Sequence, residues 1–140
     1  MPLSAENAAI DDGPEPNAFV AACPSRDILT RLGEKWTLLI LVALEDGPHR
    51  FGALRRRIEG VSQKMLTQAL RRLERDGLVH RELYDEMPLR VEYRLTELGR
   101  GVLLIVQQLK AWVEDHLHVI TDHQSVYDDR AVGKREAAAP

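Results

Sequence analysis

The sequence contains few of the residues that build disulfide scaffolds, membrane spans or aromatic-rich cores. Its single cysteine, Cys23, excludes an intrachain disulfide and fits the reducing cytoplasm. No apolar run approaches the roughly 20 residues of a transmembrane helix, and no secretory signal opens the chain. With 140 residues, the chain can bury a core without disulfides or structural metals. We therefore expect a cytoplasmic protein with no membrane contact.

Sequence motifs of common enzyme classes are also missing. The chain has no glycine-rich phosphate loop, no H-E-x-x-H pair and no G-x-S-x-G nucleophile motif. Three histidines near the end, His116, His118 and His123, do not follow a known metal-ligand spacing. We therefore expect no catalytic residue, no metal site and no cofactor, and we do not expect an enzyme.

Positive charge concentrates in residues 50–75, although the whole chain has a formal net charge of -3. This stretch holds eight basic residues and two acidic ones, so its net charge is +6. A localised positive field in an acidic chain favours the phosphate backbone of a nucleic acid as partner. Apolar residues recur at helical spacing on either side of Gly60, which predicts two short basic helices joined by a turn.

The apolar pattern predicts two helices before this basic block. Residues 35–44 are apolar almost all round, as expected for a helix enclosed by the rest of the fold. The preceding helix is expected to begin at Pro24, with Cys23 as its cap. Its inward stripe is predicted to consist of Ile28, Leu29 and Leu32.

The basic block is predicted to lie between a short extended piece, residues 49–51, and a β-ribbon. Its first helix ends near Gly60, and its second begins after Ser62, a good N-cap. The residues of the second helix expected to be buried are Met65, Leu66, Ala69, Leu70 and Leu73. Residues 78–84 and 90–96 partly alternate in polarity, which predicts two paired strands. The predicted fold class is mainly α with a small β wing.

The last predicted helix begins after Thr96 and carries two apolar stripes. The first stripe has the spacing of a coiled-coil seam and comprises Leu98, Val102, Ile105, Leu109, Trp112 and His116. The second comprises Leu103, Val106, Val113, Leu117 and Ile120. One stripe suffices for the domain's own core, so the other is expected to contact a second copy in a two-fold dimer. We assign the first stripe to the dimer interface, although the pattern alone does not decide between them.

Acidic segments flank the predicted domain on both sides. Residues 1–22 carry four acidic residues and no basic one, and residues 114–140 carry six acidic and three basic residues. We expect residues 1–20 to be a disordered tail, residues 21–122 to form the DNA-binding and dimerisation domain, and residues 123–140 to be a flexible tail.

Several motifs occur in the order found in one family of bacterial transcriptional regulators. They are CP at residues 23–24, GEKW at residues 33–36, DGPHRF at residues 46–51, MLTQALRRLERDGLV at residues 65–79 and RVEYRLTELG at residues 90–99. Over roughly residues 22–118, the sequence closely resembles the HxlR family, whose members are relatives of the MarR type. The resemblance implies a winged helix-turn-helix with a long C-terminal dimerisation helix.

The resemblance also implies how such a protein works. Its family forms homodimers through the first and last helices, with one recognition helix per subunit in a major groove and a wing along the neighbouring minor groove. The expected partner is double-stranded operator DNA with an inverted repeat. Family members repress, and in some cases activate, genes near their own. Several respond to electrophiles or oxidants through the cysteine that Cys23 matches.

The exposed face of the second basic helix supplies the predicted base contacts. Glutamine can pair with adenine, and arginine with guanine, through two hydrogen bonds. The predicted base-reading residues are Gln63, Lys64, Thr67, Gln68 and Arg71. The other cations are predicted to contact phosphates or to lie in the wing, where they raise affinity without reading sequence; they are Arg50, Arg55, Arg56, Arg57, Arg72, Arg75, Arg81, Arg90 and Arg94. Three consecutive arginines cannot all point the same way on a helix, so at least one of residues 55–57 is expected to be only a surface charge.

Cys23 has two interpretations. At the start of a helix its thiol feels the positive end of the dipole, and Arg26 lies one turn on; both favour the thiolate. Such a thiol can sense electrophiles or oxidants. Alternatively, Cys23 is an inert residue packed at an interface, and a small ligand regulates the protein, with Trp36 and Trp112 as candidate pocket residues.

The preferred function is a sequence-specific transcriptional regulator, with repression as the preferred sign. A ligand-responsive regulator with an inert Cys23 is one alternative. A winged-helix module that binds protein is another, although a recognition face this basic argues against it.

Overall fold

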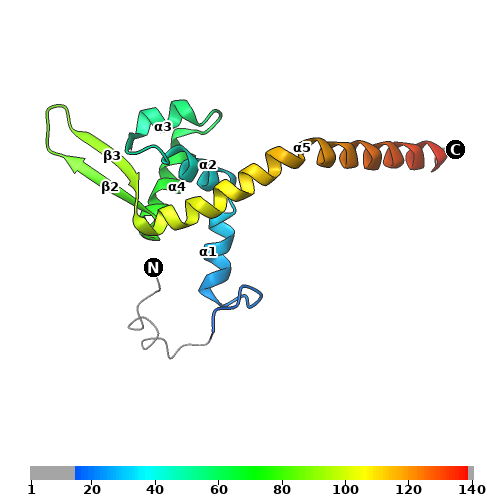
Figure 1. Ribbon diagram of the computed structural model, residues 1–140, viewed down its shortest axis with the longest axis horizontal. Helices are drawn as coiled ribbons and strands as arrows, with labels where there is room; N and C mark the ends of the chain where they lie inside the picture. Colours follow the sequence, from blue (N-terminus) through cyan, green and yellow to red (C-terminus); the bar gives the residue numbers. More distant parts are fainter. Residues whose placement is uncertain (1–14, 139–140) are drawn as a thin grey trace.

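Helices make up most of the fold. The structure is a computed structural model that describes residues 15–138. Its elements are α1 (Pro24–Leu32), α2 (Lys35–Ala43), β1 (His49–Arg50), α3 (Phe51–Arg57), α4 (Gln63–Arg75), β2 (Val79–Tyr84), β3 (Arg90–Leu95) and α5 (Glu97–Ala138). In Figure 1, α2, α3 and α4 gather around the first half of α5, while α1 and the far half of α5 project from this body. The predicted fold class is confirmed.

The core forms where α2, α3 and α4 meet the first turns of α5. Ile40 of α2, Leu54 of α3 and Leu66 of α4 are fully closed to solvent. Leu103 and Val106 of α5 close the same core from another side. The apolar pattern of residues 35–44 therefore predicted the buried helix correctly, except that one side of α2 remains open at Leu39.

β2 and β3 form the predicted ribbon, and β1 adds a third strand to it. β3 is central, in the order β1-β3-β2, and both of its neighbours are antiparallel to it. His49 of β1 lies opposite Tyr93 of β3, and Arg81 of β2 lies opposite the same residue on the other side. The extended piece predicted at residues 49–51 is thus an edge strand of the wing, and Phe51 already begins α3.

The junction between wing and α5 depends on Thr96 and Gly99. The Thr96 hydroxyl donates to the carbonyl of Gly77 (2.6 Å) and accepts from the amide of Gly99 (3.0 Å), so Thr96 caps α5 as predicted. A Cβ on Gly99 would lie 2.0 Å from the carbonyl oxygen of Leu78. This close approach of two backbones requires glycine and fixes where α5 leaves the sheet.

Two expectations about buried residues are wrong within one subunit. No residue of α1 is buried, and Ile28 and Leu29 of its expected inward stripe are 40% and 63% exposed. Only Leu32 packs against the core, because α1 points away from the body (Figure 1). Met65 is 42% exposed, because it lies one position off the line of buried leucines on α4.

The ends of the chain differ from the sequence expectation. α5 continues to Ala138, so residues 123–138, expected to be a flexible tail, are helical. This segment contains no proline and many good helix formers, so intrinsic propensity extends the helix although its side chains are almost all exposed. Of the acidic tail expected at residues 1–20, residues 1–14 lie outside the described part, and Asn17 to Val20 form a hydrogen-bonded turn. Among the described residues, no helix is long and apolar enough to cross a membrane.

Candidate nucleic-acid interface

The α3–turn–α4 unit presents a rigid helix to the outside. Ile58 and Val61 bury their side chains in the turn, and Gly60 between them has φ +87°, a backbone conformation that favours glycine. The hydroxyl of Ser62 then accepts from the amide of Met65 (3.1 Å), the predicted N-cap of α4. These local contacts fix the direction in which α4 leaves the turn.

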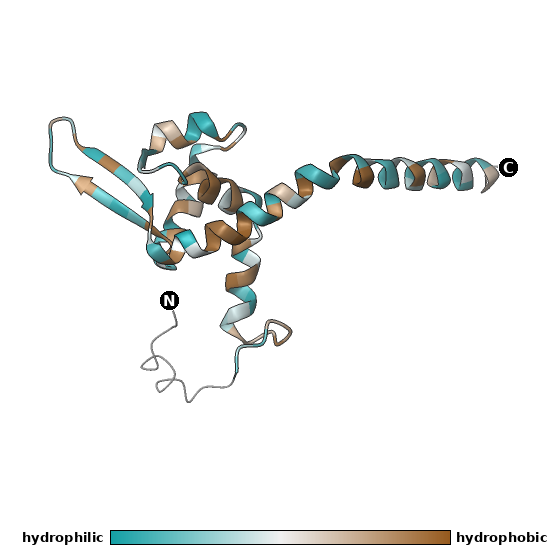
Figure 2. Ribbon diagram, in the orientation of Figure 1, coloured by the Kyte–Doolittle hydropathy of each residue, from teal (hydrophilic) through white to brown (hydrophobic). Residues whose placement is uncertain are grey.

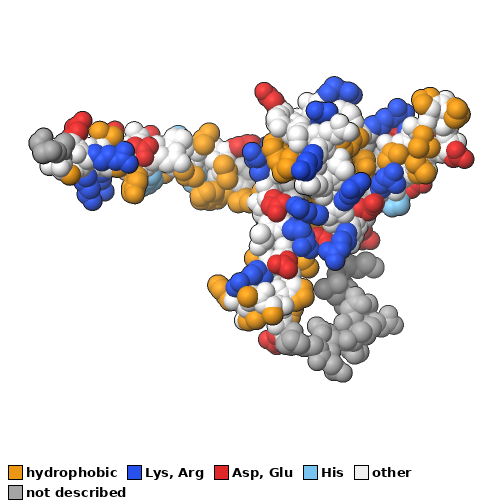
Figure 3. All heavy atoms as spheres, turned by 180° about the vertical axis from the view of Figure 1, so that it is seen from behind, with side chains coloured by type: hydrophobic (Ala, Val, Ile, Leu, Met, Phe, Trp, Pro, Cys, Tyr) orange, Lys and Arg blue, Asp and Glu red, His pale blue; other side chains and the backbone are white. Residues whose placement is uncertain are grey.

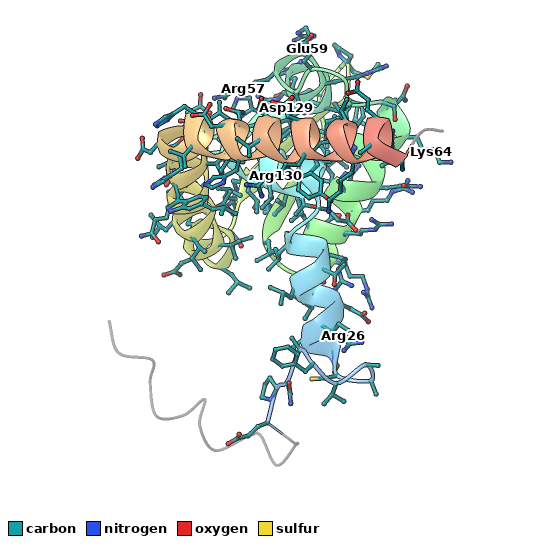
Figure 4. The ribbon with its side chains drawn as sticks, turned by 90° about the vertical axis from the view of Figure 1, so that its right-hand side faces the viewer. Arg26, Arg57, Glu59, Lys64, Asp129 and Arg130 are labelled. Atoms are coloured by element: carbon teal, nitrogen blue, oxygen red, sulfur yellow. The ribbon has the colours of Figure 1, made fainter. Side chains whose placement is uncertain are left out.

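The outward face of α4 carries the predicted base-reading residues. Leu66, Ala69, Leu70 and Leu73 face the core. By helical geometry, the opposite line of the helix is occupied by Lys64, Gln68, Arg71 and Arg75. Lys64 projects away from the body in Figure 4. Gln63, Lys64 and Arg71 are exposed, whereas Thr67 and Gln68 are half-buried.

Most cations of this surface form no ion pair among the described residues. The cations without one are Arg50, Arg55, Arg56, Lys64, Arg71, Arg75, Arg81 and Arg94. All eight side chains are exposed. Figure 3, which views the molecule from behind, shows many Lys and Arg side chains across the middle of this face, with acidic side chains among them. The surface around α4 therefore carries more exposed cations than the protein's own carboxylates hold.

Arg57 and Arg72 are held by the protein itself. Nη1 of Arg57 donates to the carbonyl of Ala43 (3.0 Å) and to Oδ1 of Asp46 (3.0 Å), which ties α3 to the end of α2. This hydrogen bond lowers the pKa of Asp46. Nη1 of Arg72 lies 3.3 Å from Oε2 of Glu34, the N-cap of α2. In the free protein, both of these arginines, predicted as phosphate contacts, are thus already paired with carboxylates.

Arg90, the predicted wing contact, is the most strongly engaged arginine of the surface. It donates to Oε1 of Glu92 (3.0 Å) and to Oε1 of Glu86 (3.1 Å). Its guanidinium carbon also lies 3.9 Å from the ring centroid of Tyr84. Two carboxylates offset its charge, and these contacts of Arg90 brace the hairpin. Of the other wing cations, Arg81 and Arg94 lie on opposite faces of the ribbon, because successive cross-strand pairs alternate.

Comparison with known proteins identifies the family. A sequence profile described as HxlR-like helix-turn-helix matches residues 31–121. The chain belongs to the HxlR-like helix-turn-helix family. It is 47% identical over 117 residues to the helix-turn-helix-type transcriptional regulator YtfH of Escherichia coli (strain K12), covering 84% of this chain and 90% of that protein.

Solved structures agree with this assignment. The transcriptional regulator ytfH from Salmonella typhimurium matches with a TM-score of 0.75 and 46% identity over 79% of this chain and 99% of that one. The redox regulator HypR in its oxidized form matches with a TM-score of 0.62 and 45% identity over 66% of this chain and 96% of that one. This HxlR-like protein is therefore a transcriptional regulator with a winged helix-turn-helix, in a family of DNA-binding regulators and not of enzymes.

In this HxlR-like chain, Cys23 is the N-cap of α1 and is half-buried. Its Sγ lies 3.1 Å from the hydroxyl of Ser25 and accepts from the amide of Asn17 (3.4 Å). These hydrogen bonds, that of Ser25 first, lower the pKa of the Cys23 thiol. Arg26, expected to favour the thiolate, instead donates to the carbonyls of Ala18 (2.9 Å) and Phe19 (2.6 Å) and so organises the turn before α1.

The two apolar stripes of α5 lie in different surroundings. Leu103 and Val106 of the second stripe are buried in the core. In the first stripe, Val102 is half-buried and the other members are exposed: Leu98, Ile105, Leu109, Trp112 and His116. Hydrophobic residues continue along the first half of α5 and onto the projecting α1 in Figure 2. Within one subunit, α1 and the first stripe of α5 thus leave apolar surface without a partner.

The two candidate pocket residues, Trp36 and Trp112, lie in separate surroundings. Trp36 lies beside Gly60, with Nζ of Lys35 4.3 Å from its ring centroid, and Trp112 stacks on His116 at 4.5 Å between centroids. An apolar groove of about 240 Å³ does exist between α2 and α5. It is lined by Leu38, Leu39, Val42, Val106, Leu109, Lys110, Val113 and Glu114.

Sequence reasoning missed the contacts that join α4 to the rest of the protein. Arg31 of α1 makes a bidentate, largely buried ion pair with Asp76, the C-cap of α4, with both N–O distances 3.2 Å. Glu34 makes the corresponding contact with Arg72. These partners lie 45 and 38 residues apart, so no local pattern signals them. The Ser25 contact to Cys23, only two residues away, was accessible from sequence.

Proposed function

We propose that this regulator binds inverted-repeat operator DNA as a homodimer and represses transcription. The observation that carries the proposal is the line of cations without ion pairs on the outward face of α4, which includes Lys64, Arg71 and Arg75. A helix of this kind fits the major groove, where lysine, glutamine and arginine can meet base edges. Arg57, Arg72 and Arg90 are paired within the protein, whereas Lys64, Arg71 and Arg75 on α4 are not.

The dimer is supported by apolar surface that one subunit leaves open. Most of the first stripe of α5 is exposed, and so are Ile28 and Leu29 of α1, which points away from the body (Figure 1). In a two-fold dimer, the same two surfaces of a second copy cover them, and each α1 contacts the helices of the partner subunit. Two recognition helices related in this way bind half-sites about 34 Å apart, one turn of DNA.

Control through Cys23 is the second part of the proposal. Hydrogen bonds from Ser25 and Asn17 favour the thiolate, the reactive form of a cysteine. The similar protein HypR is a redox regulator with an oxidized and a reduced form. A disulfide of this chain has to use Cys23 of a second subunit or a small thiol, because the sequence has no second cysteine.

The proposal is tested by fluorescence anisotropy with DNA from upstream of the protein's own gene. Unrelated competitor DNA is present, and the protein is titrated reduced and after mild thiol oxidation, with Cys23→Ser as matched control. We expect specific binding by the reduced protein, weaker binding after oxidation, and no oxidation effect in Cys23→Ser. Equal weakening of Cys23→Ser would contradict the sensor role. Sedimentation velocity in the same buffers checks the dimer.

A ligand-responsive regulator with an inert Cys23 is the alternative that a specific observation favours. The apolar groove between α2 and α5 is wide enough for a small apolar molecule, and Leu109 at its edge belongs to the first stripe. Oxidation would then leave DNA binding unchanged. A protein-binding winged helix has less support, because the outward face of α4 is basic and not apolar.

A further inference from the structure

We propose that Arg71 and Arg81 form a clamp for one phosphodiester of the DNA backbone, in the cleft between α4 and the wing. The inference rests on the proposed function and reassigns Arg71, which the sequence pattern placed among the base-reading residues. The cleft has a volume of about 310 Å³. Its lining residues are Thr67, Leu70, Arg71, Glu74, Arg81 and Tyr93.

The two arginines reach the cleft from different elements. Arg71 lies on α4, and Arg81 lies on β2 directly opposite Tyr93 of β3. Both side chains are exposed, and neither forms an ion pair among residues 15–138. Guanidinium groups that converge from two sides present several N–H donors to one anion, which is the arrangement that a phosphate oxygen pair accepts.

The position of Arg71 along α4 separates it from the base-reading end. Lys64 lies in the first turn, and Arg71 lies about 10 Å further along the axis. Recognition helices contact bases mainly with their N-terminal residues. When the start of α4 enters a major groove and the wing follows the adjacent minor groove, the strand that separates the two grooves runs between α4 and the wing. The cleft of Arg71 and Arg81 lies on that path.

The charge of the cleft fits a phosphodiester. Glu74, one turn after Arg71, lines the same cleft and offsets one of the two positive charges. The remaining formal charge of +1 balances the single negative charge of a backbone phosphate. Tyr93 adds a hydroxyl that can donate to the same anion. The DNA backbone is therefore the occupant that we infer.

The test uses a duplex enriched from a random library by the wild-type protein. Binding of wild type, Arg71→Ala and Arg81→Ala is measured to this duplex, to every single-base variant of it and to an unrelated duplex. The same duplex is also prepared with one neutral methylphosphonate linkage at each backbone position in turn. Arg130→Ala, a change of an exposed arginine far along α5 (Figure 4), is the matched control.

We expect Arg71→Ala and Arg81→Ala each to weaken binding about tenfold on all duplexes, with base preferences unchanged. When one particular linkage of each half-site is neutral, neither substitution should weaken binding to that duplex any further. The double variant should lose much less affinity than the product of the two single losses. Arg71→Lys and Arg81→Lys, which keep the charge, should recover part of the affinity. This recovery would show that the losses in the alanine variants do not come from a folding defect.

Two results would overturn the clamp. If Arg71→Ala changes the preference at one base pair and no neutral linkage suppresses its effect, Arg71 reads a base and the proposed function stands without the clamp. If the wild-type protein enriches no duplex at all, the proposed function is wrong and the clamp is overturned with it.

Discussion

Arg71 on α4 and Arg90 in the wing are both arginines of a basic winged helix, yet the structure places them in opposite situations. Arg71 is exposed and forms no ion pair among the described residues, whereas Arg90 holds Glu86 and Glu92 and stacks on Tyr84. The number of cations in a segment therefore does not measure the charge available to DNA. What matters is how many of them the protein's own carboxylates already occupy.

The largest expected change in DNA affinity follows from reversing one charge at the start of α4. Lys64→Glu places a carboxylate where the helix meets the major groove, so we expect operator affinity to fall on the order of 100-fold. Arg130→Glu, the same kind of change on the far part of α5, should leave affinity nearly unchanged. Anisotropy titrations measure both, and comparable losses in the two variants would mean that α4 is not the DNA-facing element.

Releasing Arg90 should strengthen DNA binding. In the double variant Glu86→Gln, Glu92→Gln, the guanidinium loses both charged partners and the wing loses two negative charges. We expect affinity to rise by about three- to tenfold at low salt, because repulsion of phosphate falls and a cation becomes available. An unchanged or lower affinity in the double variant would show that the wing does not approach the backbone.

Removing Arg90 should affect the protein more than its DNA complex. Arg90→Ala deletes two charge-assisted hydrogen bonds and the contact with Tyr84, so we expect the free energy of unfolding to fall by about 1 kcal/mol. DNA affinity should change by less than about threefold, since the side chain is already occupied. Chemical denaturation and anisotropy separate the two effects, and a large loss of affinity at unchanged stability would assign Arg90 to DNA.

The smallest expected effect concerns Arg57, which shares with Arg90 the role of an internally bound arginine. Its hydrogen bond lowers the pKa of Asp46 from an ordinary value of 3.8. A carboxyl whose pKa is lowered by folding adds stability above its ordinary pKa, and this contribution is lost as the pH falls through the folded value. Wild type should thus exceed Asp46→Asn in unfolding free energy at neutral pH. The difference should shrink in acid; a constant difference would exclude the pair as its cause.

The sequence predicted those features that depend on neighbouring residues. Periodicity identified the buried leucines of α4, and capping chemistry identified Ser62 and Thr96, because both signals are local. The pairing of Arg72 with Glu34 was out of reach, because it depends on how α2 and α4 pack. The contact of Arg90 with Glu92 agrees with the strand predicted at residues 90–96, because residues two apart share one face of a strand, whereas its contact with Glu86 depends on how the hairpin turns.

For the projecting helices α1 and α5, the sequence likewise predicted the apolar pattern but not the surroundings of each apolar face. Helical spacing located both stripes of α5, yet only the packed structure shows that Leu103 and Val106 face the core while Ile105 does not. The start of α1 at Pro24 was predicted, but its apolar side was assigned to the wrong surroundings, since a pattern shows that a face is apolar and not what covers it.

The salt dependence of operator binding tests the central claim most directly. The logarithm of the dissociation constant is measured against the logarithm of the salt concentration for wild type, Arg75→Ala on the outward face of α4, and Arg90→Ala in the wing. If the unpaired cations of α4 contact the backbone, the slope for Arg75→Ala should be smaller by about 0.9, the value of one phosphate contact. Arg90→Ala should keep the wild-type slope. A wild-type slope in Arg75→Ala together with a reduced slope in Arg90→Ala would contradict the account.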